Sequence, residues 1–217
     1  MPHQRIRVWD LPTRLFHWLL VAAVASLFAT AYLPGGPILL HSRLGYAVLV
    51  LLLFRLGWGV MGGYWSRFAR LVRSSPPDLG HTALGTLSIL AMVAVLLVQV
   101  GTGLISDDEV GFTGPLNHLV SAADGLRATH WHKQVGQWAI VALVALHIAA
   151  IAYYLWIRKT DLVRPMVHGD KSLPVGVDSQ TIQASRDDAR ARLLALALLL
   201  AAAAAVWVLV TRLGPSS

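Results

Sequence analysis

The amino-acid sequence predicts an all-α membrane protein with five transmembrane helices. The chain has 217 residues, 56% of them hydrophobic, and its mean hydropathy of +0.60 is too high for an ordinary soluble domain. A helix needs roughly 20 residues to cross the hydrocarbon core of a bilayer. Five apolar stretches come close to this length or exceed it, and they are Leu15–Leu33, Leu44–Met61, Thr82–Ile105, Val135–Ile157 and Leu193–Val210. Their connections are short or moderate, so we expect one membrane domain without a separate soluble module.

The first helix is expected to begin before its apolar run. Asp10 can cap it, and Pro12 can occupy its first turn, where a missing N–H costs nothing. His17 then lies about a turn and a half inside the helix. Ala29-Thr30-Ala31 has the small-residue pattern of a signal-peptide cleavage site. The length of the apolar stretch favours a retained span over this alternative.

The remaining helices have recognisable borders. Gly35-Gly36-Pro37 introduces the second helix and places His41 in its first turns. The segment Ser106–Lys133 is long enough to form a cap or a docking surface on the outer side. The stretch Lys171–Ala184 is polar and is expected to be an irregular inner loop. Ser185 begins the fifth helix with Asp188 in the spacing of a capping box.

The formal net charge of +7 reflects membrane topology rather than a nucleic-acid partner. Fourteen of the eighteen Lys and Arg residues fall on alternate segments: the N-terminal region, the end of the second helix with its loop, and 158–192. Cytoplasmic loops carry the excess of Lys and Arg. We therefore expect the N-terminus in the cytoplasm and, with five spans, the C-terminus in the periplasm of a bacterial inner membrane.

The sequence contains no cysteine. This excludes iron–sulfur clusters held by thiolates, thiolate zinc sites and the C-x-x-C-H attachment of c-type haem. It gives no information about the compartment, because a bundle in lipid needs no disulfides.

Histidines inside the predicted spans are the main functional signal. Ionisable residues within a membrane are expensive, usually face the bundle interior and mark function. His147 lies in the middle of the fourth span, in "AIVALVALHIAAIAYYLW". Taken alone, such a residue could simply hydrogen-bond to another helix, so its meaning depends on the other histidines.

Four histidines can form two couples at different depths. His17 lies near the inner end of the first span and His41 at the outer start of the second. His132 stands at the outer start of the fourth span, fifteen residues before His147. Helix geometry separates these two by about 22 Å and by about 60° in direction. His41 can meet His132 and His17 can meet His147, which is what two haems with paired imidazole ligands require.

A proton relay is an alternative role for these histidines. A proton relay usually includes Asp or Glu, and none of the five apolar stretches contains either. His130, two residues before His132, is the main rival for the role of fourth ligand. Weaker candidates stand at the borders of spans or in loops, and they are His81, His118 and His168.

Arginines near the histidines are candidates for binding haem propionates. Arg14 precedes His17 by three positions on the same helix face, Arg55 lies deep in the second span, and Arg43 is near His41. A guanidinium suits a carboxylate in a partly buried site. Arg14 could equally be a topology-setting residue at a helix end. Several glycines would let either a flat macrocycle or a neighbouring helix approach the backbone closely, and they are Gly45, Gly57, Gly85, Gly101, Gly103 and Gly136.

At these residues the chain resembles the bacterial cytochrome b561 group and the related cytochrome b subunits of nickel–iron hydrogenases. "RVWDLPTRLFHWLL" resembles the opening of that group, and "HSRLGYAVLVLLLFRLGWG" its second helix. "LGHTALG" is similar to its third helix and "LVRPMVHGDK" to the basic tail after its fourth. The likeness covers roughly residues 5 to 171, so we expect a di-haem bundle over 1–171 and an inner loop with an extra helix over 172–217.

The resemblance implies a four-helix transmembrane bundle that holds two haems b, with a fifth helix outside that core. His17 and His147 would ligate the inner haem, and His41 and His132 the outer one. The spacing from His132 to His147 is one residue longer than is usual in the family, a difference that a π-bulge can absorb. The family transfers electrons between a partner redox protein, such as a hydrogenase or a cytochrome c, and membrane quinone.

The sequence therefore predicts an electron-transferring membrane subunit of a respiratory complex, embedded in lipid, rather than a stand-alone enzyme. Two alternatives stay open at this point. One is an enzyme that oxidises superoxide or another small reductant and reduces quinone. The other is a haem-free transporter or anchor.

Overall fold

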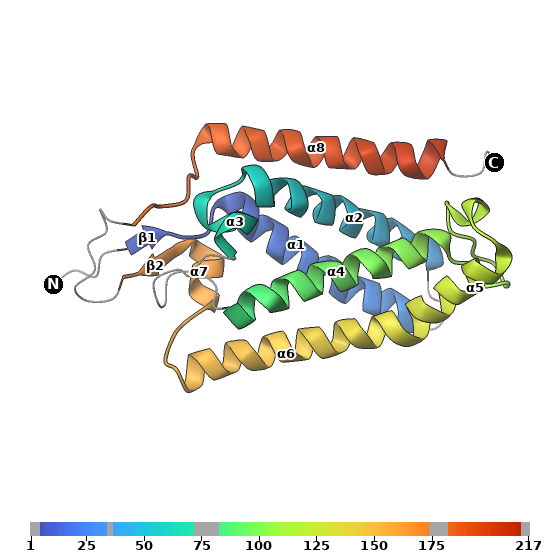
Figure 1. The fold of residues 1–217 in the computed structure, drawn as a ribbon, viewed down its shortest axis with the longest axis horizontal. Helices are drawn as coiled ribbons and strands as arrows, with labels where there is room; N and C mark the ends of the chain where they lie inside the picture. The colour runs from blue at the N-terminus through green and yellow to red at the C-terminus, as the bar shows by residue number, and fades with distance from the viewer. Residues whose placement is uncertain (1–4, 34–36, 72–82, 174–181, 214–217) are drawn as a thin grey trace. The chain divides into compact units, whose positions relative to one another are not determined.

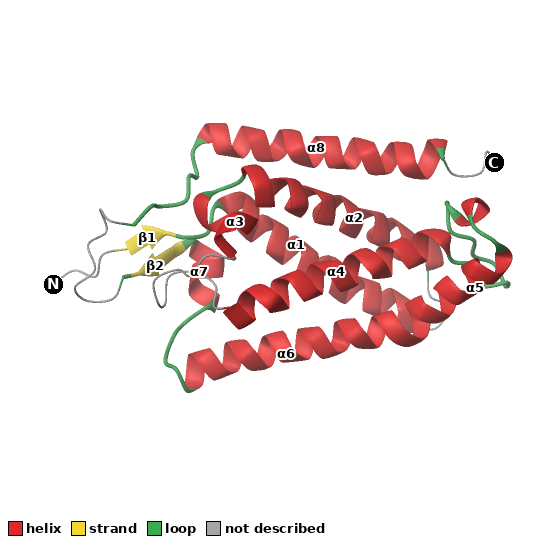
Figure 2. Cartoon of the chain, in the orientation of Figure 1, coloured by secondary structure: helices red, strands yellow, loops and turns green. Residues whose placement is uncertain are grey.

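The structure of the chain is a computed structural model that describes residues 5–33, 37–71, 83–173 and 182–213 (Figure 1). Within these ranges the chain is mostly helical, with one short pair of strands (Figure 2). The elements are β1 (Arg5–Arg7), α1 (Leu11–Tyr32), α2 (Ile38–Met61), η1 (Tyr64–Ser66), α3 (Phe68–Leu71), α4 (Ala83–Ile105), η2 (Asn117–Leu119), α5 (Ala122–His130), η3 (Trp131–Gly136), α6 (Gln137–Trp156), α7 (Val163–His168), β2 (Asp170–Ser172) and α8 (Ala189–Arg212).

Five of the described helical segments are long and apolar enough to cross a membrane. They are Leu11–Tyr32, Ile38–Met61, Leu84–Ile105, Ala122–Trp156 and Ala189–Arg212. The predicted all-α class and the five spans are thereby confirmed, and the chain is a multi-pass membrane protein.

The start of α1 agrees with the sequence prediction. Asp10 caps the helix, because its Oδ1 accepts hydrogen bonds from the backbone N–H of Thr13 at 2.8 Å and from the Thr13 hydroxyl at 2.6 Å. The second helix starts at Ile38, earlier than the apolar run suggested, and the N–H of His41 donates to the carbonyl of Pro37 at 2.9 Å. His41 is therefore a helical residue of the first turn.

The capping box predicted for the fifth helix is wrong. The helix begins at Ala189, and Asp188 caps it by accepting from the N–H of Ala191 at 2.8 Å. That N–H and the neighbouring Arg186 hold the pKa of Asp188 below its usual range. Ser185 instead donates to the carbonyl of Val8 at 2.7 Å and accepts from the N–H of Trp65 at 3.3 Å. It joins the segment before α8 to the segment that follows β1.

A two-stranded antiparallel sheet was not expected from the sequence. β1 pairs with β2 so that Arg5 faces Ser172 and Arg7 faces Asp170. The Arg7 guanidinium bonds Asp170 at 2.6 Å and Asp187 at 2.8 Å, and these carboxylates raise the pKa of Arg7 above its usual range. Part of the predicted inner loop Lys171–Ala184 is thus a strand, and residues 174–181 lie outside the described ranges.

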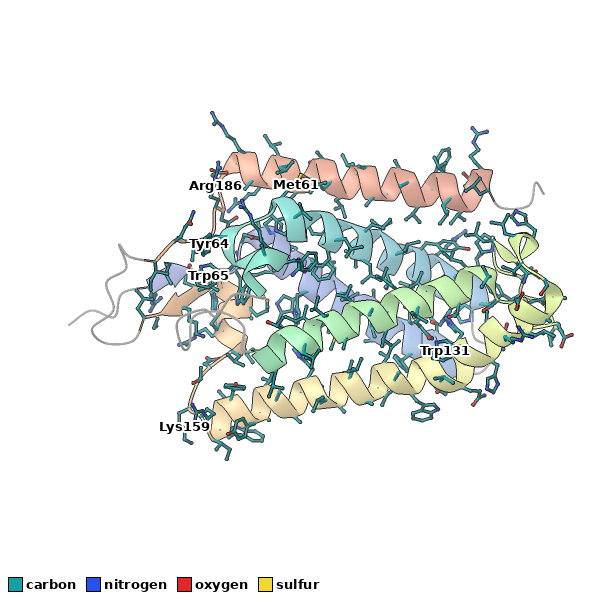
Figure 3. The ribbon with its side chains drawn as sticks, viewed as in Figure 1. Met61, Tyr64, Trp65, Trp131, Lys159 and Arg186 are labelled. Atoms are coloured by element: carbon teal, nitrogen blue, oxygen red, sulfur yellow. The ribbon has the colours of Figure 1, made fainter. Side chains whose placement is uncertain are left out.

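The chain divides into two compact units, each made of discontinuous segments. The first comprises residues 1–18, 54–90 and 145–198, and the second 19–53, 91–144 and 199–217. The core of the first unit is built from Ile6, Val8, Trp9, Trp65 and Leu173, and Figure 3 shows Tyr64 and Trp65 side by side on η1. The core of the second is built from Val48, Leu52, Leu96, Val100, Leu104 and Ile140. The domain boundary that the sequence suggests between residues 171 and 172 stays a prediction.

A buried carboxylate organises the first unit. Asp10 is 0% exposed, and besides capping α1 it accepts from the Ser66 hydroxyl at 2.8 Å and from the indole N–H of Trp58 at 3.1 Å. A Cβ at Gly63 would collide with the carboxylate, so glycine is required for this approach. The side chain of Asp10 therefore fastens the start of α1 to the end of α2 and to η1.

Replacement of Asp10 by Asn should destabilise the protein. The side-chain amide of Asn would place N–H donors where the Asp10 carboxylate accepts hydrogen bonds from three side chains. A buried donor left unpaired costs about 1–3 kcal/mol. We expect a lower midpoint of thermal unfolding in detergent, measured by circular dichroism. Asp161→Asn is the matched control, because Asp161 is exposed and Asn caps the N–H groups of Val163 and Arg164 equally well. Equal midpoints for the two variants would contradict this role of Asp10.

Candidate functional site

The second unit brings His41 and His132 together. His41 comes from the first turn of α2 and His132 from η3, and both side chains are half-buried. Their ring centres are 6.2 Å apart and the ring planes are inclined by 74°. The two rings are arranged edge to face.

Hydrogen bonds fix the orientation of both rings. Nδ1 of His132 lies 2.8 Å from the carbonyl oxygen of Gln99 and 3.3 Å from the Thr102 hydroxyl. Because a carbonyl can only accept, Nδ1 of His132 carries the proton and Nε2 keeps its lone pair. Nδ1 of His41 lies 3.1 Å from the hydroxyl of Thr30. Partners of this kind set the tautomer and the direction of metal-binding imidazoles.

The segment that carries His132 is a π-helix. It spans Trp131–Gly136 between α5 and α6, and Figure 3 labels Trp131 at its start. A π-segment of the kind that can absorb the extra residue between His132 and His147 is therefore present at His132. The amide of Gln99 donates to the backbone carbonyl of His132 at 3.0 Å. A Cβ at Gly103 would come within 3.1 Å of the His132 ring, so α4 approaches this ring closely at a glycine.

His41 and His132 line a cavity of about 530 Å³ in the second unit. Ligand pockets commonly measure about 300–1,000 Å³ and combine an apolar lining with a few polar groups. The lining here is of that kind, with Leu27, Phe28, Val48, Leu96, Val100 and Ile140 among its apolar side chains. Asp108 also lines it, and the backbone N–H groups of Gly111, Phe112 and Val110 hold the pKa of Asp108 below its usual range.

The first unit brings His17 and His147 together. The ring centres of this couple, from α1 and α6, are 6.5 Å apart with an interplanar angle of 51°. The Nδ1 atom of His17 is buried and has no hydrogen-bond partner among the described residues. Trp18 touches the same ring edge-on, with ring centres 5.0 Å apart.

Both couples have the separation that two axial ligands of one metal ion require. With metal–imidazole bonds of about 2.0 Å and a ring nitrogen about 1.1 Å from its ring centre, two axial imidazoles have centres about 6.2 Å apart. The measured separations are 6.2 and 6.5 Å. No group of three or more His, Cys, Asp or Glu residues that could hold a bare metal ion occurs in the described ranges. The residues therefore fit an iron whose other ligands come from a macrocycle.

The three candidate arginines have different surroundings. Arg14 donates to the carbonyl of Val167 at 2.6 Å, and its Nε is buried without a partner among the described residues. Arg55 is 5% exposed, donates to the carbonyl of Ser66 at 3.2 Å and stacks over the ring of Phe68 at 4.8 Å. Arg43 is exposed on α2. The binding of haem propionates by these arginines stays a prediction. Arg55 also has a structural role, because it contacts Ser66 and Phe68.

The glycines separate into two groups. A Cβ at Gly57 would touch Leu198 of α8 at 3.5 Å, and one at Gly136 would collide with Gln99, so these two serve contacts within the protein. A Cβ at Gly45 or Gly101 would meet nothing within 4 Å, and Gly45 lines the cavity.

The remaining histidines are not joined to either couple. His130, His118 and His168 are exposed. His81 lies outside the described residues. The structure therefore places His132, and not His130, beside His41.

Sequence reasoning missed Thr30, Gln99 and Thr102, which orient the rings. The available signal was their polarity: Gln99 and Thr102 interrupt an otherwise apolar span three residues apart and hence lie on one helix face.

Comparison with known proteins identifies a family and several relatives of this sequence. Residues 8–169 match the family model described as prokaryotic cytochrome b561. A protein of Escherichia coli K12 named "Probable Ni/Fe-hydrogenase 1 B-type cytochrome subunit" is 22% identical, over 78% of this chain and 92% of the relative. A "Probable Ni/Fe-hydrogenase B-type cytochrome subunit" of Rhizobium leguminosarum is 21% identical, over 77% of this chain and 89% of the relative.

No solved structure matches the chain significantly. The family match covers well over half of the sequence and includes all four paired histidines. The chain therefore belongs to the prokaryotic cytochrome b561 family, and as a multi-pass b-type cytochrome it binds haem b and transfers electrons in the membrane.

Proposed function

We propose that the chain binds two haems b and carries electrons between a hydrogenase partner and the quinone pool, as the membrane subunit of a respiratory complex. The observation that carries this proposal is the pair of imidazole couples, with ring centres 6.2 and 6.5 Å apart. Each couple lies wholly within one of the two compact units. One site in each unit is the simplest explanation of this arrangement.

His41 and His132 would hold the outer haem, and His17 and His147 the inner one. With two imidazoles as its ligands, each haem would supply one-electron redox chemistry and would offer no open position to a substrate. Thr30 and the Gln99 carbonyl hold the outer rings in place. This arrangement favours electron transfer over catalysis at the iron.

Charged and apolar side chains complete each site. Arg14 near His17 and Arg43 near His41 are suited to bind propionates, because a guanidinium forms strong paired bonds with a carboxylate. In the outer site, Val48, Leu96 and Val100 belong both to the cavity wall and to the buried core. These apolar side chains keep water away from the rings, and burial of this kind is one determinant of redox potential.

The hydrogenase partner is inferred from the names of the relatives, which describe cytochrome subunits of nickel–iron hydrogenases. Oxidation of hydrogen yields two electrons and two protons, and reduction of a quinone to a quinol consumes the same numbers. The chain would carry only the electrons. The names also favour a subunit over the alternative of a stand-alone enzyme acting on superoxide.

The excess of Lys and Arg supports an orientation with the N-terminus in the cytoplasm and the C-terminus in the periplasm. Arg14 and Arg55 are then near the cytoplasmic side, and Arg43, Arg127 and Lys133 near the periplasmic side. The couple of His41 and His132 would be the periplasmic one.

The purified chain should contain two haems, each lost when one of its ligands is replaced. Wild type should give a b-type reduced-minus-oxidised spectrum and about two haems per chain by pyridine haemochrome. His17→Ala and His147→Ala should remove one haem, and His41→Ala and His132→Ala the other, because an iron with one axial imidazole is held weakly. His130→Ala is the control and should keep both. A colourless, folded preparation, or full occupancy in any of the four variants, would show the pairing to be wrong.

Filling the cavity should displace the outer haem selectively. Gly45→Leu introduces a side chain into the space beside His41, whereas Gly101→Leu makes the same change at an exposed position of α4. A Cβ meets nothing within 4 Å at either glycine, so both chains should fold. We expect about one haem per chain in Gly45→Leu and two in Gly101→Leu, again by pyridine haemochrome. Two haems in Gly45→Leu would mean that the cavity is not the haem site.

The electron path can be tested in the complex isolated from native membranes. We expect hydrogenase subunits to co-purify with the chain, hydrogen gas to reduce its haem absorbance within seconds, and a soluble quinone to reoxidise it. His147→Ala should abolish the passage of electrons to quinone while hydrogenase still reduces an artificial dye. Rapid reduction of the isolated chain by superoxide, with no response to hydrogen in the complex, would instead support the stand-alone enzyme.

A further inference from the structure

A second cavity, unrelated to the histidine couples, lies in the first unit. It measures about 310 Å³ and is lined by Arg5, Arg164, His168, Asp170 and Ser172. These residues come from β1, α7 and β2. None of the four paired histidines contributes to its wall.

The strand register explains why Arg5 and Ser172 share this wall. Arg5 lies directly opposite Ser172, and Arg7 opposite Asp170. Side chains alternate between the faces of a strand, so these four point to one face while Ile6 points to the other. Ile6 is buried in the core of the unit. The core contact of Ile6 therefore determines that Arg5 faces the cavity.

A glycine turn brings the third element to the cavity. Arg164 and His168 are four residues apart on α7 and so lie on one face of that helix. Gly169 ends α7 with φ of +91°, and its carbonyl accepts from the N–H groups of Val8 and Trp9. A Cβ at this position would come within 2.7 Å of the Trp9 carbonyl. This turn directs the chain from α7 into β2 and holds both basic residues beside the strands.

The charge of the cavity is positive. Asp170 is the acidic residue of the lining, and the Arg7 guanidinium already bonds both of its oxygens, at 2.6 and 3.4 Å. Arg5 and Arg164 are exposed, and neither has an ion pair with a described residue. Their guanidinium groups, the His168 ring and the Ser172 hydroxyl can all donate hydrogen bonds. This donor set matches the oxygens of a phosphate group.

An apolar stripe lies next to these donors on α7. Val163 and Val167 each immediately precede one of the basic residues, and they are 41% and 46% exposed. They are four residues apart and therefore share a face. Exposed valines beside arginines suit a membrane surface, where phosphates lie next to acyl chains.

We propose that this cavity binds the phosphate group of an anionic phospholipid, with Arg5 and Arg164 as its main ligands and Val163 and Val167 against the acyl chains. Basic pockets at the membrane surface commonly bind acidic headgroups. Free phosphate shares the charge and the oxygens but lacks the apolar part. The site would attach the β1–β2 sheet and α7 to the lipid surface.

The test uses the full chain in neutral detergent, with its haem content measured as a check of folding. Water-soluble short-chain phosphatidylglycerol, short-chain phosphatidylcholine and inorganic phosphate are titrated separately by calorimetry. We expect one saturable site that prefers phosphatidylglycerol. Arg164→Gln should weaken it about fivefold and the double variant Arg5→Gln/Arg164→Gln about 25-fold, since each basic residue contributes a similar amount to binding of anionic lipid.

Arg158→Gln is the matched control, because Arg158 is also exposed and basic but lies outside the cavity. It should bind phosphatidylglycerol like wild type. Phosphate binding as tight as that of the lipid, and equally sensitive to Arg164→Gln, would overturn the lipid assignment in favour of a free anion. Equal weakening by Arg158→Gln and Arg164→Gln, with haem content unchanged, would overturn the site altogether.

Discussion

An imidazole inside a bilayer depends on protein groups for hydrogen bonds to its ring nitrogens, because no water is available there. Leaving such a group unpaired costs free energy, and helices in lipid therefore place polar side chains toward one another. In the second unit, Thr30 and the Gln99 carbonyl engage Nδ1 of the two rings. The ring centres of His41 and His132 lie 6.2 Å apart, a separation that suits two imidazole ligands of one iron.

The features predictable from sequence were those set by local pattern or by the cost of burial. Five apolar runs, the Asp10 cap and the four interior histidines all belong to this class. The couples themselves followed from topology, since alternate spans run in opposite directions and bring His41 to the same side as His132. The choice between His130 and His132 could not follow in this way. It depends on the rotation of one helix, which the π-segment at Trp131–Gly136 changes.

Features that depend on long-range contacts were missed or mistaken. Ser185 and Asp188 have the spacing of a capping box. The Ser185 hydroxyl, however, bonds the Val8 carbonyl and the Trp65 N–H and does not cap the helix. The contacts of Arg55 with the Ser66 carbonyl and the Phe68 ring were likewise missed, whereas its predicted role toward a propionate stays a prediction. In both cases the decisive partner is remote in sequence, and a local pattern carries no information about it.

The fifth helix illustrates how such remote contacts can give a segment a structural role. A simple anchor would need only its apolar length, yet the segment leading into α8 is tied to the first unit at several points. Asp187 bonds Arg7 at 2.8 Å and Arg192 at 3.1 Å, and Ser185 bonds the backbone at Val8. Further along, Leu198 packs where Gly57 leaves room on α2. Arg7 also holds Asp170 of β2, so one guanidinium joins the strand pair to the start of α8. The segment that begins α8 is therefore integrated with the unit that carries His17 and His147, and removing it would expose that unit as well as shorten the chain.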